Sequence, residues 1–260
     1  MKLATLDDGS RDGHLAVVSR DLATAHFATG IAGTLQRVLD DWNFLAPQLQ
    51  DLYDTLNDGR ARHAFAFDPA VCMAPLPRAF ERWQAMPDGG LHRVGSADAL
   101  GPQTVPDAVR PEAPATLTPA LAVVTGDVAD GTEAAAALDA VRLLLLLGDW
   151  KPGRGCQAPV AVTPDELGRD WHGGRPHLSL MTGADARHLQ PHEAAAALSR
   201  HFGEWIAEVA AAGRLRAGTV IGCPIEAAVM TTRHAGDSVY LEALAADGAS
   251  VFGAIRTRRV

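Results

Sequence analysis

The first part of the chain alternates short apolar runs with a polar, glycine-containing stretch. Residues 3–6 and 15–19, LATL and LAVVS, are mostly apolar, and they flank a polar stretch that contains DDGSRDG. Gly9 and Gly13 within it supply the backbone freedom that a reversing turn needs. The pattern therefore predicts two short strands joined as a β-hairpin.

A helical spacing of apolar residues begins after Ile31. These residues recur three and four positions apart, at Leu35, Val38, Leu39, Trp42 and Leu45. Such spacing predicts an amphipathic helix that turns these side chains toward the core. Proline suits the first turn of a helix and glycine its end, so a second helical stretch is predicted from Pro47 to Gly59.

Prolines then interrupt the helical pattern at Pro69, Pro75 and Pro77. We place a domain boundary near residue 75, with a small N-terminal α/β domain at residues 1–75 and a larger domain at residues 76–260. Residues 87–119 contain several further prolines and little periodicity. Irregular chain or a loop is predicted there.

The remaining pattern mixes strands and helices. A strand is predicted at 121–128, a helix at 133–141, and a strand followed by a turn at 158–168. The apolar run at 142–149 fits either a buried strand or a helix end. The clearest helical pattern covers residues 191–213, from Pro191 to Gly213, and strands are predicted at 219–223, 238–244 and 250–255. The predicted fold class is α+β.

Net charge and the length of the apolar runs exclude several classes of partner. The chain has 260 residues and a net charge of −8, so it repels phosphate backbones and anionic lipid, and nucleic acid is not an expected partner. The longest apolar run, at residues 143–147, is far shorter than the roughly 20 residues that span a bilayer. The N-terminal residues carry Asp7 and Asp8 where a signal peptide is apolar. We expect a cytoplasmic protein without a membrane partner.

Three cysteines, Cys72, Cys156 and Cys223, lie far apart in the sequence. They form neither a CxxC metal pair nor a disulfide framework, and we expect reduced, buried and inert thiols.

Several blocks, in order, resemble the fumarylacetoacetate hydrolase family, in particular its bacterial two-domain members. They are MKLATLDDGSRDG, LQDLYDTLNDGRARHAFAFDP, CMAPLPRA, LAVVTGDV, PVAVTPDELG, LRAGTVIG and GDSVYLEALAADGASVFGAI. The resemblance implies a small N-terminal domain followed by a mixed β-roll or sandwich domain, usually dimeric, with Mg²⁺ or Mn²⁺ bound. It also implies hydrolysis of β-diketo acids, or decarboxylation or tautomerisation of related keto acids.

The resemblance further implies a set of site residues. A hard divalent cation takes oxygen ligands, which the family supplies from a Glu-x-Glu pair on a strand and from an Asp after an apolar strand. Alternate residues of a strand face the same side, so the Glu-x-Glu pair can act together. In the family, a His-Glu pair on a lid segment acts on the attacking water molecule. A Lys and a Gly-Thr-rich loop contact the substrate.

Most of these positions differ in this chain. Counting back from LAVVTGDV, the Glu-x-Glu positions fall on Thr118 and Ala120, which cannot serve as anionic ligands. Asp149 matches the metal-binding Asp, and Lys151-Pro152 resembles the family's Lys-Pro pair. After PLPRA the chain reads FERWQAMPDGG without a His-Glu pair, and CPIEAAVMTTRHAGD replaces the substrate loop.

Other acids and histidines offer weaker ligand candidates. Glu112 precedes the expected strand, and Glu226 lies in the substituted loop, where we consider it a possible substrate contact. His188 and His192 are four residues apart, the spacing of a zinc pair on a helix. Pro191 between them favours a solvated helix start instead. One remaining carboxylate, Asp149, holds Mg²⁺ poorly, so we expect no metal cofactor.

Three hypotheses follow. In the first, the chain keeps the family fold but has lost metal-dependent catalysis and acts as a ligand-binding or partner subunit, as a homodimer or as a heterodimer with a related subunit. In the second, Asp149 and Lys151, with Glu226 or Cys156, form a residual or repurposed site for a small keto acid. A purely structural role for Asp149 and Lys151 is the alternative, in which the Asp-Lys pair braces the former cavity. In the third, the chain is an active hydrolase whose ligands lie elsewhere.

Overall fold

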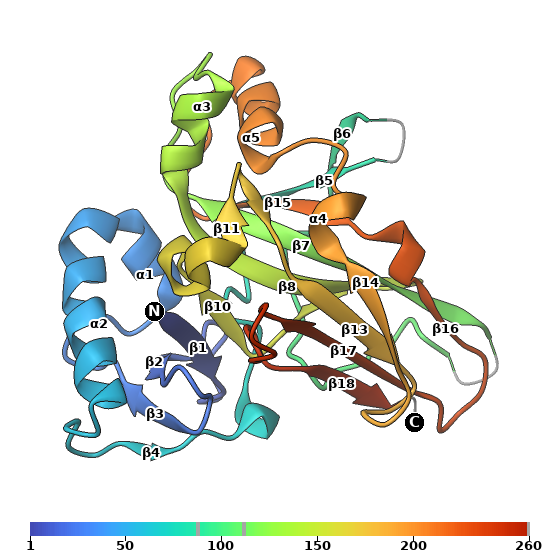
Figure 1. Ribbon diagram of the computed structural model, residues 1–260, viewed down its shortest axis with the longest axis horizontal. Coiled ribbons are helices and arrows are strands. Elements are labelled where there is room, and N and C mark those ends of the chain that lie inside the picture. The colour runs from blue at the N-terminus through green and yellow to red at the C-terminus, as the bar shows by residue number, and fades with distance from the viewer. Residues whose placement is uncertain (87–88, 111–112, 259–260) are drawn as a thin grey trace.

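A computed structural model describes residues 1–86, 89–110 and 113–258. A large curled sheet forms the centre of the molecule, with strand order β4-β3-β2-β1-β10-β8-β7-β15-β5-β6, while β16 pairs with β7 and β9 with β8 (Figure 1). Its strands are β1 (Lys2–Leu6), β2 (His14–Val18), β3 (Thr24–Phe27), β4 (Phe65–Ala66), β5 (Glu81–Ala85), β6 (Leu91–Arg93), β7 (Ala115–Thr125), β8 (Val141–Lys151), β9 (Gly155–Gln157), β10 (Val160–Val162), β15 (Thr219–Pro224) and β16 (Met230–Thr232).

A smaller sheet of order β14-β13-β17-β18 packs on one face of the large sheet. Its strands are β13 (Ser179–Gly183), β14 (Leu189–Glu193), β17 (Ser238–Leu244) and β18 (Ile255–Arg258), and a separate hairpin joins β11 (Trp171–His172) to β12 (Arg175–Pro176). The helices are α1 (Leu35–Asp40), α2 (Trp42–Asn57), α3 (Ala134–Ala137), α4 (Ala194–Ala197) and α5 (Phe202–Ala211). Short 3-10 turns are η1 (Pro69–Val71), η2 (Leu138–Ala140), η3 (Pro164–Asp170) and η4 (Glu226–Ala228).

The two faces of the large sheet bury two separate cores. One core gathers α1, α2 and one set of side chains from β7 and β8, including Ala122 and Leu145. The other gathers α5, the smaller sheet and the alternate set, including Leu121 and Leu144. Covering on both faces explains the unbroken apolar run from Leu143 to Leu147 in β8. This resolves the ambiguous run at 142–149 as a buried strand and confirms the predicted α+β class.

The N-terminal hairpin is confirmed, and it continues the large sheet. β1 pairs with β2 on one side and with β10 on the other, with Leu3 opposite Ala161. Strands from before and after residue 75 therefore share one sheet. The boundary near residue 75 stays a prediction.

The predicted start of the second N-terminal helix was wrong. The second N-terminal helix begins at Trp42 rather than at Pro47, because the N–H groups of Phe44 and Leu45 already donate to the Asp41 carbonyl, at 3.2 and 3.0 Å. Pro47 lies inside the helix, near enough to its start that only one intrahelical hydrogen bond is lost.

The helix predicted over 191–213 is instead a strand and two helices. Pro191 lies in β14, an edge strand opposite Met181 of β13, where a missing N–H is tolerated. The helical pattern breaks between α4 and α5 because Arg175 donates to the carbonyls of Ala195 and Leu198. His201 then starts α5 with a capping box, in which its backbone N–H donates to Glu204 at 2.9 Å.

Two predicted strands differ in extent. β7 starts at Ala115 rather than at residue 121, and Pro119 is accommodated opposite Gly148 while its carbonyl accepts from Ile225 N–H at 2.8 Å. The last strand starts at Ile255 rather than at residue 250. Between β6 and β7 the described residues form no long element, as predicted. Over the described ranges, no helix is long and apolar enough to cross a bilayer.

Candidate functional site

β7 and β8 bring together the positions at which the resemblance places metal ligands. Thr118 lies directly opposite Asp149, and Ala120 lies opposite Leu147. Ala120 and Leu147 belong to the same core, so these positions share one face of the sheet. Thr118 is 3% exposed and Ala120 is fully buried. The cluster therefore contains a single carboxylate, that of Asp149.

Arg82 of β5 binds that carboxylate. Its Nη2 donates to both carboxylate oxygens of Asp149, each at 2.6 Å. The side chains of Arg82 and Asp149 are 9% and 10% exposed, so the ion pair is buried. β7 and β15 separate β5 from β8 in the strand order, so the two side chains meet because the sheet curls at this end.

Gly155 of β9 leaves room for this ion pair. It lies opposite Asp149 in the ladder between β8 and β9. A Cβ atom at Gly155 would lie 2.5 Å from Asp149 Oδ1 and 2.7 Å from Arg82 Nη1. Any larger residue at this position would therefore collide with both partners of the pair.

Little free space remains beside the pair. A hollow of about 10 Å³ is bordered by Arg82, Gly155 and Gln157, which is room for roughly one water molecule. The Gln157 amide is held by the backbone of Leu76, at 3.2 and 3.3 Å. Arg82 Nε is buried without a hydrogen-bond partner in the described part of the chain. Arg82, rather than Trp150, fills the cavity, because Trp150 faces the opposite core.

The residues present do not fit a divalent cation held as the resemblance implies. Mg²⁺ and Mn²⁺ require several oxygen ligands, whereas Thr118 and Ala120 carry no charge. Both oxygens of Asp149 already accept from a guanidinium. Nowhere in the described ranges do three or more His, Cys, Asp or Glu side chains gather in a way that could hold a metal ion.

Lys151 does not pair with Asp149, so the expectation of a bracing Asp-Lys pair was wrong. Lys151 is exposed at the end of β8, opposite Thr116. Asp149, two residues earlier in β8, is buried, and its carboxylate forms an ion pair with Arg82. The structure thus separates the two residues that the sequence placed together in a residual site.

The cysteines have the inert character expected of them. All three are free thiols; Cys156 and Cys223 are buried and Cys72 is half-buried. Burial raises the pKa of the Cys156 thiol to about 12, and this thiol donates to the Gly148 carbonyl at 3.3 Å. Burial likewise raises the pKa of Cys72 to about 12 and that of Cys223 to about 11. None of these thiols is poised as a nucleophile near neutral pH.

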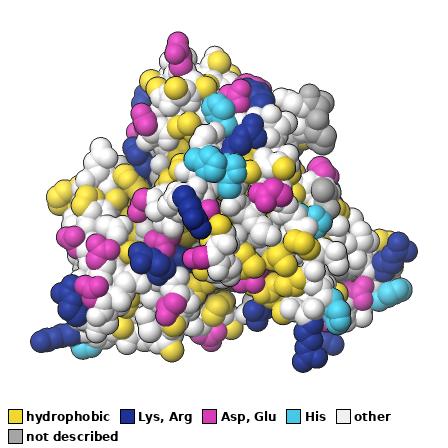
Figure 2. All heavy atoms as spheres, viewed as in Figure 1, with side chains coloured by type: hydrophobic (Ala, Val, Ile, Leu, Met, Phe, Trp, Pro, Cys, Tyr) yellow, Lys and Arg dark blue, Asp and Glu magenta, His cyan; other side chains and the backbone are white. Residues whose placement is uncertain are grey.

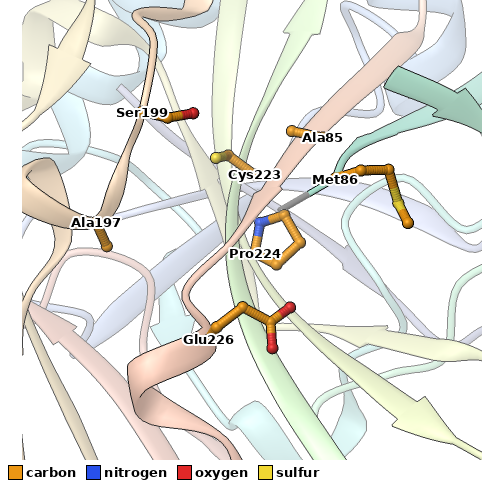
Figure 3. A pocket seen from close by; sticks show the side chains of 7 residues that line it. All are labelled: Ala85, Met86, Ala197, Ser199, Cys223, Pro224 and Glu226. Carbon is orange, nitrogen blue, oxygen red and sulfur yellow. The ribbon is translucent and has the colours of Figure 1, made fainter. Parts of the chain in front are cut away.

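Glu226 borders a different hollow, of about 260 Å³, on the other face of the sheet. Figure 3 shows Ser199 and Cys223 together on one side of this hollow and Glu226 on the other side of Pro224. Glu226 is exposed. Neither Asp149 nor Lys151 borders this hollow, so the proposed contact at Glu226 and the family site lie apart.

The histidine candidates do not form a zinc pair. His188 precedes β14 and contacts Asp185 at 3.2 Å, while His192 lies within β14 and shares a hydrogen bond with Thr182 Oγ1 at 3.0 Å. The expected helix start at Pro191 is absent because this segment is a strand. Glu112 lies outside the described residues.

Arg82 is the residue that sequence reasoning missed. Its segment, FERWQAMPDGG, lacks the family's His-Glu pair and carries no other recognisable motif. Within β5, Arg82 and Ala85 are buried, whereas Glu81, Trp83 and Gln84 are only half-buried. An arginine at a strand position, in a chain that keeps Asp149 at the end of an apolar strand, is the signal that could have indicated the pair.

Comparisons with known proteins agree on the fold. Residues 1–78 match the family model described as fumarylacetoacetase N-terminal domain 2. Maleylpyruvate hydrolase from Sphingobium sp. SYK-6 is 16% identical over 100% of this chain and 99% of its own, with a TM-score of 0.74. Another structure of that hydrolase contains manganese(II) and pyruvate.

Two further structures have the same fold. A probable 2-hydroxyhepta-2,4-diene-1,7-dioate isomerase from Mycobacterium abscessus is 16% identical over 100% of this chain and 98% of its own, with a TM-score of 0.71. Fumarylacetoacetate hydrolase from Exiguobacterium antarcticum is 14% identical over 100% and 99%, with a TM-score of 0.66. No curated protein matches the chain. The first 78 residues therefore match a fumarylacetoacetase N-terminal domain, and the whole chain adopts the fold of the fumarylacetoacetate hydrolase and related structures.

Proposed function

We propose that this chain keeps the family scaffold without its metal-dependent carbon–carbon bond hydrolysis and acts as a ligand-binding or partner subunit. The observation that carries the proposal is the buried Arg82–Asp149 ion pair at the cluster of Thr118, Ala120 and Asp149. Here a guanidinium supplies the positive charge that a divalent cation supplies in the family.

Electrostatic repulsion makes the Arg82–Asp149 ion pair incompatible with a divalent cation bound at Asp149. A divalent cation about 4 Å from the Arg82 guanidinium would be repelled by roughly 8 kcal/mol at an effective dielectric constant of about 20. A cation at Asp149 would therefore have to displace Arg82 from a covered position. Without the cation, no Lewis acid polarises a ketone or stabilises the enolate that leaves in such a reaction.

The small free volume beside Arg82 also supports the proposed loss of catalysis. The hollow beside Arg82 has about 10 Å³, too little for a keto acid. The alternative of a residual enzyme at Asp149 and Lys151 requires both side chains to face one substrate. Lys151 is exposed while Asp149 is covered and paired, and Cys156 is fully buried. No observation favours that alternative.

The partner is proposed as a second copy of this chain or a related subunit, because the family resemblance implies dimers. Light scattering on the purified chain is the measurement. A mass equal to twice that of the chain would support a homodimer, and a mass equal to one chain would contradict it.

Metal content and turnover test the loss of catalysis. The chain is incubated with excess MnCl₂, desalted and analysed for manganese by mass spectrometry. Pyruvate release from maleylpyruvate, the substrate class of the structurally similar hydrolase, is followed with lactate dehydrogenase. We expect substoichiometric manganese and no pyruvate above the enzyme-free blank. Stoichiometric manganese together with pyruvate release would contradict the proposal.

A further inference from the structure

The hollow beside Glu226, here called the β15 hollow, has a buried and largely apolar floor. Ala85 of β5 and Cys223 of β15 form this floor, and they are 3% and 4% exposed. The two strands run parallel with Gly222 opposite Gln84, so the next residues along each strand, Cys223 and Ala85, also lie side by side. Both belong to the same core, so their side chains point to the same face of the large sheet.

The rim of the β15 hollow is open to solvent. It is formed by Met86 after β5, by Ala197 and Ser199 from α4 and the chain that follows it, and by Pro224 and Glu226 from the end of β15 and the start of η4. Pro224 is half-buried and the others are exposed. The hollow has about 260 Å³, the volume that roughly nine water molecules take up in the liquid. A ligand of roughly seven heavy atoms therefore fits.

Glu226 supplies the charge at the rim of the β15 hollow. Among the described residues, no Lys, Arg or His borders the hollow. The Glu226 carboxylate forms neither a hydrogen bond nor an ion pair within the described part of the chain, so it is available to a ligand. An anionic keto acid, the ligand expected at Glu226 from the sequence, would be repelled by this carboxylate, whereas a cation is attracted to it.

Arg175 of β12 determines the direction in which a cationic ligand would lie. Its guanidinium donates to the carbonyls of Ala195 and Leu198 and does not border the hollow. Burial raises the pKa of the Cys223 thiol to about 11, and the positive charge of Arg175 acts on the same thiol in the opposite sense. A ligand cation is therefore disfavoured over Cys223 and favoured at Glu226, which Figure 3 shows on the other side of the hollow.

An apolar floor with one carboxylate at the rim suits a small ligand that has an apolar chain and a cationic head. Figure 2 shows hydrophobic and acidic side chains close together near the position that Figure 1 labels α4. We propose that the β15 hollow binds a small alkylammonium ion, with its ammonium head at Glu226 and its apolar chain over Ala85 and Cys223. Neither Arg82 nor Asp149 borders the hollow, so this assignment does not depend on the proposed loss of catalysis.

NMR titration of the ¹⁵N-labelled full chain with hexylamine near neutral pH tests the proposal. The amine is then protonated, since an alkylammonium such as the lysine side chain has a pKa of about 10.4. Hexanol keeps the apolar chain without the charge, hexanoate reverses the charge, and methylamine keeps the head without the chain. Hexylammonium should bind at least about threefold more tightly than each of the three, because a solvent-exposed ion pair and apolar burial both contribute. A smaller difference from any of the three would overturn the assignment.

Variants locate the binding site. Glu226→Gln removes the charge at nearly constant size, so it should weaken hexylammonium binding at least about threefold and leave hexanol binding unchanged. Ala197→Trp should weaken the binding of both by filling the hollow. Both changes are at exposed positions, and their folding is checked by circular dichroism. Glu133→Gln, at an exposed carboxylate outside the hollow, is the matched control and should bind hexylammonium as the unmodified chain does. Unchanged hexylammonium affinity in folded Glu226→Gln or Ala197→Trp would overturn the proposal.

Discussion

Replacing Arg82 with alanine is expected to lower the free energy of unfolding by about 3–5 kcal/mol, because it leaves the Asp149 carboxylate buried and unpaired. The pair is about nine-tenths covered, and both carboxylate oxygens depend on one guanidinium nitrogen. Urea unfolding followed by circular dichroism measures the change. A domain typically has only about 5–15 kcal/mol of stability, so the loss should be large.

The exposed pair of Arg78 with Asp12 is the matched control. Arg78 also donates two hydrogen bonds to an aspartate, but its side chain is 49% exposed and that of Asp12 is 38% exposed. Arg78→Ala should therefore cost no more than about 1 kcal/mol. Similar losses for Arg82→Ala and Arg78→Ala would contradict the account of Arg82.

A double variant keeps this test informative if Arg82→Ala does not fold. R82M/D149L replaces both charges by apolar side chains of similar size. Apolar replacement of a whole buried ion pair is often neutral or stabilising. We therefore expect R82M/D149L to recover most of the stability lost in Arg82→Ala.

Gly155→Ala is the second change expected to have a large effect. Its Cβ would lie 2.5 Å from Asp149 Oδ1 and 2.7 Å from Arg82 Nη1, so the ion pair must shift or break. Overpacking of this kind costs about 1–3 kcal/mol, and urea unfolding again measures it.

Gly95→Ala is the control for the backbone effect of adding a methyl group. A Cβ at Gly95 meets nothing within 4 Å. Replacing glycine by alanine at a compatible position is neutral or slightly stabilising, by less than about 1 kcal/mol. Equal stability of Gly155→Ala and Gly95→Ala would contradict the close contact of Gly155 with the ion pair.

Local patterns predicted much of the fold. Glycine-containing turns and apolar alternation indicated the first hairpin, and the end-to-end resemblance indicated the family scaffold. The helix predicted over 191–213 failed because a tertiary contact, Arg175 with the carbonyls of Ala195 and Leu198, overrides helical spacing there. Pro191 resembled a helix start because proline suits both a first helical turn and an edge strand.

The candidate site was only partly predictable, for a physical reason. Counting along the strands located Thr118, Ala120 and Asp149, and strand pairing places Thr118 beside Asp149. Arg82 is 67 residues before Asp149, and the contact depends on how the sheet curls. Sequence spacing holds no information about that curl, and it favours Lys151, two residues from Asp149, as the partner.

Anomalous X-ray scattering from crystals soaked in MnCl₂ and pyruvate tests the central claim most directly. If Arg82 takes the place of the cation, the anomalous map should show no manganese peak at Asp149. The electron density should show the Arg82 guanidinium bound to both carboxylate oxygens of Asp149. A manganese peak within about 2.0–2.6 Å of an Asp149 oxygen, with Arg82 displaced, would contradict the account.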